Sequence, residues 1–329
     1  MKDFFGWVPM RIFWRDAQPI VDWAFLGTRR FTDPFFAQTI QPCLRHPADL
    51  LFRHQTPLET LGEIAATQPS LRPTGFIFHM SRCGSTLTSQ MLAALPSNLV
   101  LSEVEPIDDI LNAHFKHPHV TEEQRVQWLR SLVTALAWRR SPTEKNVLIK
   151  LDCWHVMFLP LIQRAFPGVP WIYQYREPVE VMASAMKQLG RQMIPGVLDA
   201  SLFGWDAATV GKMSLYEYAA RVLAKLCEAA LAEAQAGRGK LLNYQQLPAV
   251  WPELMEHWRV NFSAEENQRM LAATEMNAKN PVLPFASDSE EKRRFVSPEI
   301  RELTHRWLED VYQKLEAQRM IQGFATTPL

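Results

Sequence analysis

The 329-residue sequence contains few cysteines, no long apolar run and no net charge. Its four cysteines are widely spaced and form no C-x-x-C pair. This spacing argues against a disulfide framework and against a zinc site, and it favours a reducing, cytoplasmic compartment. No stretch approaches the roughly 18 consecutive apolar residues of a membrane span, so we expect none. Charge and proline also interrupt the first residues too early for a secretory signal.

The charge balance excludes a further class of function. Lys and Arg together number 35, and so do Asp and Glu. The chain therefore has no overall positive field that would attract nucleic acid or an anionic membrane. Its length and its apolar content of 47% are sufficient for a full hydrophobic core. Any anion-binding site must be local, and the motifs of the chain must identify it.

The most informative segment is F-I-F-H-M-S-R-C-G-S-T-L, at residues 76–87. An apolar strand, a loop of small residues and the start of a helix together form an anion cradle. Unpaired backbone N–H groups and the positive end of the helix dipole point at the same place. Arg82, Ser85 and Thr86 add side-chain donors. The segment predicts a phosphate-binding loop, although a strand–turn–helix in which Gly84 only permits a tight turn has the same pattern.

This loop differs from that of nucleotide kinases, which carry a lysine directly after the second glycine. Here Gly84 is followed by Ser85, and the basic residue Arg82 comes two positions earlier. The order R-x-G-[ST]-T resembles the 5′-phosphosulfate loop of sulfotransferases that use 3′-phosphoadenosine 5′-phosphosulfate (PAPS). The resemblance implies that six residues bind the 5′ end of PAPS, namely Arg82, Cys83, Gly84, Ser85, Thr86 and Leu87. The thiol of Cys83 lies at a helix N-terminus, where a thiol pKa can fall, but the family usually has a small residue there.

A second motif follows the apolar run W-I-Y-Q-Y, which predicts a buried strand. The next residues, R-E-P-V-E-V-M-A-S, resemble the 3′-phosphate motif of the same family. Arg176 and Ser184 are eight positions apart, as in the family, and Pro178 suits the first turn of a helix. Both side chains can then reach one phosphate. The alternative is that Arg176 pairs with Glu180 and that Ser184 is a packing residue.

Two more predicted strands end in charged residues. Glu103 follows L-V-L-S, and Lys150 ends the run V-L-I-K. Resemblance to the tyrosylprotein-type sulfotransferases implies that Glu103 is the general base and that Lys150 lies near the sulfonyl group. Glu105 remains a rival base, and so does Asp152, which stands where cytosolic sulfotransferases have a histidine. Lys150 has a structural alternative, a pairing with Asp152 or Asp108.

The later features of the family are weaker in this chain. The segment L-L-N-Y-Q-Q-L resembles a turn whose tyrosine, here Tyr244, contacts the nucleotide in some members. The distal basic loop of the family is not recognisable, and a charged run at residues 287–294 takes its place. Lys292, Arg293 or Arg294 can close over the 3′-phosphate, and the sequence does not select among them. A charged run is more often a solvated loop.

The alternation of apolar strands and helices predicts an α/β fold with a parallel sheet covered by helices on both faces. The resemblance implies a P-loop type of sheet. Right-handed crossovers place the carboxyl ends of all its strands at one edge. We therefore expect four residues from distant segments to meet there, namely Arg82, Glu103, Lys150 and Arg176. The strands are expected near residues 75, 99, 147, 171 and 241.

Residues 1–70 differ in composition from the rest, with many aromatic side chains, arginines and prolines. We interpret them as a mostly helical N-terminal extension packed on a main domain of residues 71–329. Short helices are expected at residues 21–26 and 33–40. A long scaffold helix is predicted at 215–235, and a final helix is predicted to start at Ser297.

These observations favour a sulfotransferase that moves a sulfonate group from PAPS to a hydroxyl or amine. The acceptor is expected to be a small molecule or a peptide, and no metal, nucleic acid or membrane span is expected. His79 and His155 border the predicted site and are interpreted as structural residues. Two alternatives remain, an atypical P-loop kinase and a non-catalytic nucleotide-binding module. The sequence specifies neither the acceptor nor the oligomeric state.

Overall fold

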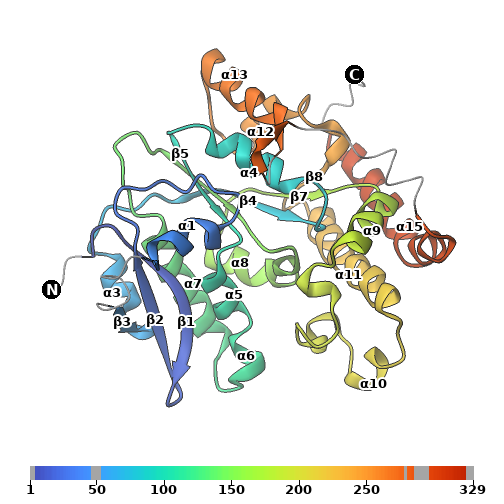
Figure 1. Ribbon diagram of the computed structural model, residues 1–329, viewed down its shortest axis with the longest axis horizontal. Coiled ribbons are helices and arrows are strands. Elements are labelled where there is room, and N and C mark those ends of the chain that lie inside the picture. The colour runs from blue at the N-terminus through green and yellow to red at the C-terminus, as the bar shows by residue number, and fades with distance from the viewer. Residues whose placement is uncertain (1–3, 46–52, 278–279, 285–295, 324–329) are drawn as a thin grey trace.

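A five-stranded parallel sheet forms the centre of the computed structural model, which describes residues 4–45, 53–277, 280–284 and 296–323 (Figure 1). Each strand is rich in buried apolar residues, as expected of a sheet with both faces covered. The α/β fold class and all five expected strand positions are confirmed. In spatial order the strands are β5 (Asn98–Ser102), β6 (Asn146–Lys150), β4 (Pro73–His79), β7 (Trp171–Tyr175) and β8 (Lys240–Asn243).

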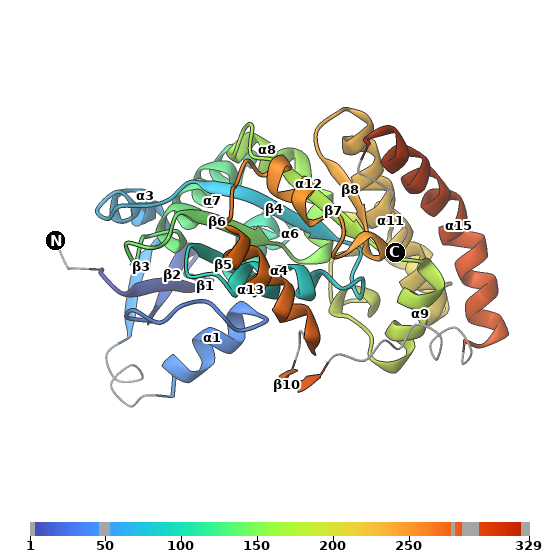
Figure 2. The same cartoon turned by 90° about the horizontal axis from the view of Figure 1, so that it is seen from above.

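Helices cover both faces of this sheet (Figures 1 and 2). On one face lie α5 (Glu105–Leu111), α7 (Glu122–Leu136), α8 (Leu159–Ala165), α9 (Pro178–Lys187), α11 (Leu215–Gln235) and α15 (Pro298–Ile321). On the other face lie α4 (Ser85–Ala93), α12 (Trp251–His257) and α13 (Ala264–Ala272). Among the described residues, no helix is both long and apolar enough to cross a bilayer.

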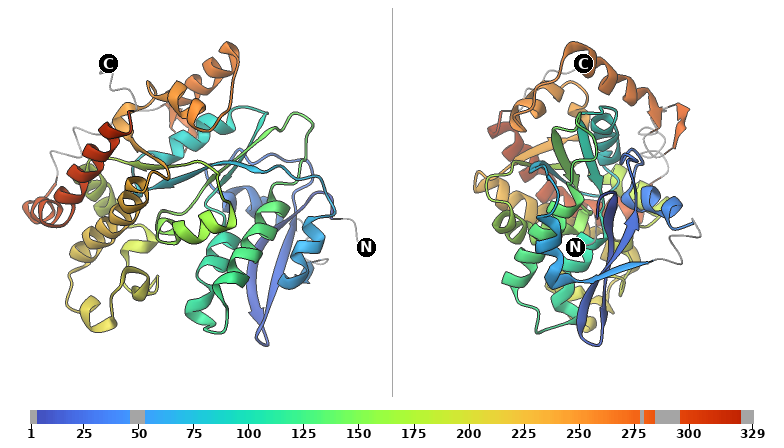
Figure 3. Two further views of the ribbon diagram at one scale, coloured as in Figure 1. Left: turned by 180° about the vertical axis from the view of Figure 1, so that it is seen from behind. Right: turned by 90° about the vertical axis from the view of Figure 1, so that its left-hand side faces the viewer.

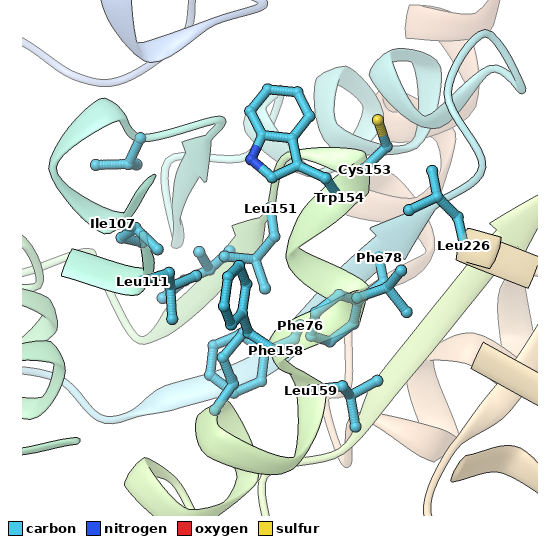
Figure 4. Packing of buried hydrophobic residues seen from close by; sticks show 14 of the residues in the cluster. Phe76, Phe78, Ile107, Leu111, Leu151, Cys153, Trp154, Phe158, Leu159 and Leu226 are labelled. Carbon is cyan, nitrogen blue, oxygen red and sulfur yellow. The ribbon is translucent and has the colours of Figure 1, made fainter. Parts of the chain in front are cut away.

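The pleat of each strand divides the core into two clusters. Phe76 and Phe78 of β4 point toward Phe158 and Leu159 in the larger cluster (Figure 4). Ile77, between them, belongs to the second cluster on the opposite face. The sheet is therefore held rigidly between two packed layers, which fixes the positions of its carboxyl ends.

Two predicted scaffold helices are confirmed. The helix predicted at 215–235 is α11, and Ser297 caps α15 by accepting a hydrogen bond from the backbone N–H of Ile300 at 3.3 Å. The remaining described elements are short. They comprise α1 (Phe36–Cys43), α3 (Leu61–Ala65), α6 (Ala113–Lys116), α10 (Ala207–Val210), β9 (Met276–Asn277), β10 (Asn280–Pro284) and 3₁₀ turns at Leu58–Thr60, Cys153–Phe158, Arg191–Met193, Ala200–Phe203, Tyr244–Gln246 and Ala273–Glu275.

The prediction of a mostly helical N-terminal extension is wrong. The segment forms an antiparallel sheet of β1 (Trp7–Arg15), β2 (Gln18–Phe25) and β3 (His54–Pro57), and the expected helix at 21–26 lies largely in β2. Of the two expected helices only the second is present, as α1, and it begins three residues later. Pairing with β1 and β3 on either side decides the conformation of β2, and sequence periodicity does not reveal such pairing.

The N-terminal sheet packs against the central part of the molecule. Figures 1 and 3 show the blue β1–β2 hairpin beside α5 and α7. The backbone N–H of Ile12 donates to Oδ2 of Asp109 on α5 at 2.8 Å. Burial, together with the negative charges of Asp108 and Glu105, raises the pKa of Asp109 from 3.8 to about 7. The hydrogen bond from Ile12 favours the ionised carboxylate, but burial outweighs it and favours the protonated carboxyl group.

The burial of Asp109 predicts a measurable pH dependence of stability. Because the folded-state pKa of Asp109 lies above its unfolded value, the folded protein binds the proton more tightly, and stability falls as pH rises from about 4 to about 7. Asp109→Asn keeps an oxygen acceptor for Ile12 but does not ionise. Urea denaturation should show that the loss of unfolding free energy between pH 5 and pH 8 is smaller in the variant by about 1–3 kcal/mol.

The matched control is Asp16→Asn, at an exposed aspartate in the turn of the same hairpin. It should retain the pH dependence of the unsubstituted protein. An Asp109→Asn variant with that same full dependence would contradict the proposed titration.

Candidate functional site

The loop between β4 and α4 has the backbone of an anion cradle. Ser81, Arg82 and Gly84 adopt left-handed conformations, with φ of 72°, 53° and 84°, and α4 begins at Ser85. A Cβ atom on Gly84 would lie 2.4 Å from Cε2 of Tyr244, so only glycine fits beneath this ring. The first N–H groups of α4 therefore open toward the carboxyl edge of the sheet.

Gln174, on the neighbouring strand β7, fixes this loop in place. Its Oε1 accepts from the Thr88 hydroxyl at 2.8 Å, and its Nε2 donates to the carbonyl of Cys83 at 3.0 Å. Its own carbonyl accepts from the Cys83 thiol at 3.1 Å and from the N–H of Met80 at 2.9 Å. No sequence motif identifies this residue, although a lone glutamine inside the apolar run W-I-Y-Q-Y is a usable signal.

Cys83 is a packing residue in this arrangement. Burial raises the pKa of its thiol to about 11. The thiol is therefore a protonated donor, and the idea of a lowered thiol pKa at this helix N-terminus is wrong for Cys83. Desolvation outweighs the backbone hydrogen bonds of Met80 and Ser85 and the nearby positive charges, all of which lower the pKa.

The two predicted phosphate motifs meet, but with different partners from those expected. Nε of Arg82 donates to the hydroxyl of Ser184 on α9 at 2.8 Å. Arg176 forms an ion pair with Glu180, which was the alternative considered for it, and its guanidinium lies 4.5 Å from the ring centroid of Tyr244. The loop, α9 and Tyr244 therefore form one continuous group of donors and aromatic surface.

A second group lies at the ends of β5 and β6. Nζ of Lys150 forms an ion pair with Oε1 of Glu103, and the N–H of Glu103 donates to the carbonyl of Lys150 at 2.7 Å. The Lys150 side chain is completely buried, whereas 24% of the Glu103 side chain is exposed. The expected alternative, a pairing of Lys150 with Asp152 or Asp108, is not what the structure has.

The Glu103 carboxylate is ionised and held by donors. Burial would raise the pKa of Glu103, but the Lys150 ammonium and the His79 imidazole together lower it below its usual range. Nε2 of His79 lies 3.6 Å from Oε1 of Glu103 and 3.0 Å from the carbonyl of Leu151. Nδ1 of His79 accepts from the N–H of Ser81 at 3.0 Å, and burial lowers the pKa of the ring. His79 is therefore a neutral imidazole that joins the loop to the Glu103 group.

The two rival carboxylates differ in their surroundings. Glu105 is exposed at the start of α5. Burial raises the pKa of Asp152 to about 7, and Oδ2 of Asp152 lies 3.9 Å from Nε2 of His155. The same nitrogen lies 2.9 Å from Oδ1 of Asp108, which also accepts from Nε1 of Trp154 at 2.6 Å. Asp152 therefore titrates near neutrality beside the Glu103 group and stays a candidate base.

Strand order relates the two groups in space. Lys150 ends β6 and Arg176 follows β7, and β4 with its loop lies between these strands. Neighbouring strands are about 4.8 Å apart, so the two groups are separated by roughly 10 Å across the loop. A ligand that spans both groups must cross the loop. Lys292, Arg293 and Arg294 lie outside the described residues, and among the described ones no cluster of His, Cys, Asp and Glu suits a metal ion.

Comparison with known proteins gives a family match. The model described as the Sulfotransferase family matches residues 73–257, more than half of the chain. No curated protein sequence matches significantly. The match begins at β4 and ends at α12, so it includes the whole central sheet and leaves out the N-terminal sheet.

Several solved structures are similar in fold. A sulfotransferase from Alicyclobacillus acidocaldarius has 14% identity and a TM-score of 0.42, over 76% of this chain and 96% of that one. The sulfotransferase domain of the Synechococcus PCC 7002 olefin synthase has 16% identity and a TM-score of 0.46, with the same coverage. A mouse sulfotransferase complexed with PAP has 9% identity and a TM-score of 0.42, over 82% of this chain and 93% of that one.

The role of Gln174 predicts a specific loss of stability. Gln174→Leu fills a similar volume but leaves the carbonyl of Cys83 and the hydroxyl of Thr88 without their partner. The loss of a partner for these two buried polar groups should lower the free energy of unfolding by about 2–5 kcal/mol, measured by urea denaturation. The control is Gln192→Leu, because Gln192 is also buried but its Nε2 donates to no acceptor among the described residues. Equal losses in the two variants would argue against the role of Gln174.

Proposed function

This chain belongs to the sulfotransferase family, and we propose that it transfers a sulfonate group from PAPS to a hydroxyl or amine. The observation that carries the proposal is the arrangement of the two groups on either side of the β4–α4 loop. One contains a carboxylate paired with a buried ammonium, and the other contains two arginines with Ser184 and Tyr244. A donor with a reactive sulfonate at one end and a 3′-phosphate at the other needs both.

The donor is proposed to lie along the carboxyl edge of the sheet. Its 5′ end would accept hydrogen bonds from the loop at residues 82–87, where backbone N–H groups and the helix dipole favour an anion. Its 3′-phosphate would lie against Arg176 and Ser184, with the ring of Tyr244 nearby. Arg293 and Arg294 are proposed as further contacts of this phosphate.

The reaction follows from the proton acceptor and the fixed cations. Glu103 takes the proton from the acceptor hydroxyl or amine while the acceptor atom forms a bond to sulfur. The bond between sulfur and the bridging oxygen of the 5′-phosphate breaks. The product, 3′-phosphoadenosine 5′-phosphate (PAP), leaves with the electron pair on that oxygen. Lys150 stabilises the negative charge that develops on the sulfonyl and bridging oxygens. Arg82, which the sequence also predicted for this role, donates to Ser184 and lies in the group proposed for the 3′-phosphate.

The first test is nucleotide selectivity. PAP should raise the melting temperature of the protein far more than ADP or ATP, because only PAP has phosphates at both ends of the proposed site. A ligand at 1,000 times its Kd adds about 4 kcal/mol of stability, which a thermal shift assay detects easily. Equal stabilisation by ATP and PAP, or none by PAP, would count against the proposal and in favour of a kinase or another role.

A variant extends this test to the 3′-phosphate. Arg176→Gln combined with Glu180→Gln removes both charges of the buried pair, so neither is left uncompensated. Affinity for PAP should fall by about 10- to 100-fold, since hydrogen bonds to charged groups are worth about 1.5–3 kcal/mol. Affinity for adenosine 5′-phosphate, which lacks the 3′-phosphate, should change little.

A further prediction concerns the base. Glu103→Gln should lower the rate of sulfonate transfer by about 10²- to 10⁴-fold, because the amide takes no proton, while affinity for PAP is retained. Transfer from labelled PAPS to a panel of phenols, alcohols and amines is the measurement. Asp152→Asn and Glu105→Gln are the matched controls. A larger loss of transfer in either control would reassign the base.

A further inference from the structure

The N-terminal segment contributes an aromatic ring to the ammonium group of Lys150. Nζ of Lys150 lies 5.1 Å from the ring centroid of Phe35, which precedes α1. Lys150 itself is at the end of β6, and its side chain is completely buried. The ammonium group is therefore covered by the carboxylate of Glu103 and the ring of Phe35.

This contact has a clear physical basis. Burial of an ammonium group is costly because the group loses its hydration. The face of an aromatic ring carries negative potential, and a cation within about 6 Å of the ring centroid is attracted to it, more strongly when water is excluded. The Phe35 ring therefore offsets part of the lost hydration of Lys150. It does not take up the N–H group that donates to Glu103.

The position of Phe35 is fixed by its neighbours in the segment. Phe31 and Phe36 are buried, and their rings stack with centroids 5.6 Å apart. Arg30 donates to the carbonyls of Ala93 and Leu95 at 3.1 and 2.7 Å, at the end of α4. The segment is thus anchored to the same helix whose N-terminus forms the phosphate loop.

We propose that Phe35 is a positioning residue of the active site, whose ring holds the Lys150 ammonium against Glu103 for sulfonate transfer. The N-terminal segment then belongs to the catalytic machinery although the family match begins only at residue 73. This inference rests on the proposed function, because it takes Lys150 as the group that stabilises the leaving oxygen. The contact between the ring and the ammonium can be tested without that premise.

The test without turnover is lysine labelling. Reductive methylation of the full-length protein, followed by mass spectrometry, measures how accessible each lysine is. Lys150 should be protected in the unsubstituted protein, and Phe35→Ala should raise its labelling by about fivefold or more, because the ring no longer covers the ammonium. The control is Phe25→Leu, at a half-exposed phenylalanine at the end of β2 in the N-terminal sheet. It should leave the labelling unchanged.

The test with turnover separates ring electrostatics from apolar packing. Release of PAP from PAPS is followed with the best phenol of the panel, or with water as acceptor. Phe35→Leu keeps an apolar side chain but removes the ring, and kcat should fall by about 2- to 30-fold, the range of a cation–π contact. The KM for PAPS and the affinity for PAP should stay within about twofold. Phe35→Tyr retains the ring and should keep kcat close to that of the unsubstituted protein.

The outcomes distinguish this inference from the proposed function. Unchanged labelling of Lys150 in Phe35→Ala, or unchanged kcat in Phe35→Leu, overturns the role of Phe35 while PAP binding still supports a sulfotransferase. An equal loss of kcat in Phe35→Tyr and Phe35→Leu also overturns it, because the ring face is then irrelevant. Failure of the unsubstituted protein to bind PAP overturns the proposed function. The labelling result then bears only on the contact between the Phe35 ring and the Lys150 ammonium group.

Discussion

The buried ammonium group of Lys150 constrains the candidate site more than any other group. A cation without water needs a counter-charge close by, and Glu103 supplies it from the neighbouring strand. This pairing requires the chain to turn back directly after β5, over the end of β6. A backbone hydrogen bond holds the chain in this turn, because the N–H of Glu103 donates to the carbonyl of Lys150. The carboxylate and the cation are therefore held together before any ligand arrives, which is the preorganisation that electrostatic catalysis needs.

That arrangement has a cost in backbone strain, and the strain is localised. Glu103 has a φ of 53°, and Ser81 and Arg82 are also left-handed. Such conformations cost a residue other than glycine about 1–2 kcal/mol each. Asp16 and Ala17 share them in the tight turn of a hairpin, and Arg259 shares them just after the end of α12, and in both places this geometry is ordinary. The strain that no turn explains is therefore concentrated at the carboxyl edge of the sheet, where it directs side chains toward the site.

The central sheet could be predicted from the sequence because each of its strands is a short apolar run that ends in polar residues. The N-terminal sheet could not. The segment I-V-D-W-A-F fits either a strand or a helix, and its aspartate suggests an exposed position. In the structure Asp22 is buried in the middle of β2. Its negative charge is compensated by Arg11 of β1 and by Arg53, the residue directly before β3. Partners that distant leave no periodic signal in a sequence.

That these side chains meet at one edge of the sheet could also be predicted, but their pairing could not, since pairing depends on strand order. Glu103 and Lys150 are 47 residues apart and meet because β5 lies beside β6, at the opposite flank of β4 from β7. The same order places Arg176 and Tyr244 on that other flank. A donor bound across β4 would then present its sulfonate to one pair and its 3′-phosphate to the other. Phe35 carries no motif at all, and only the folded chain shows that the N-terminal segment reaches Lys150.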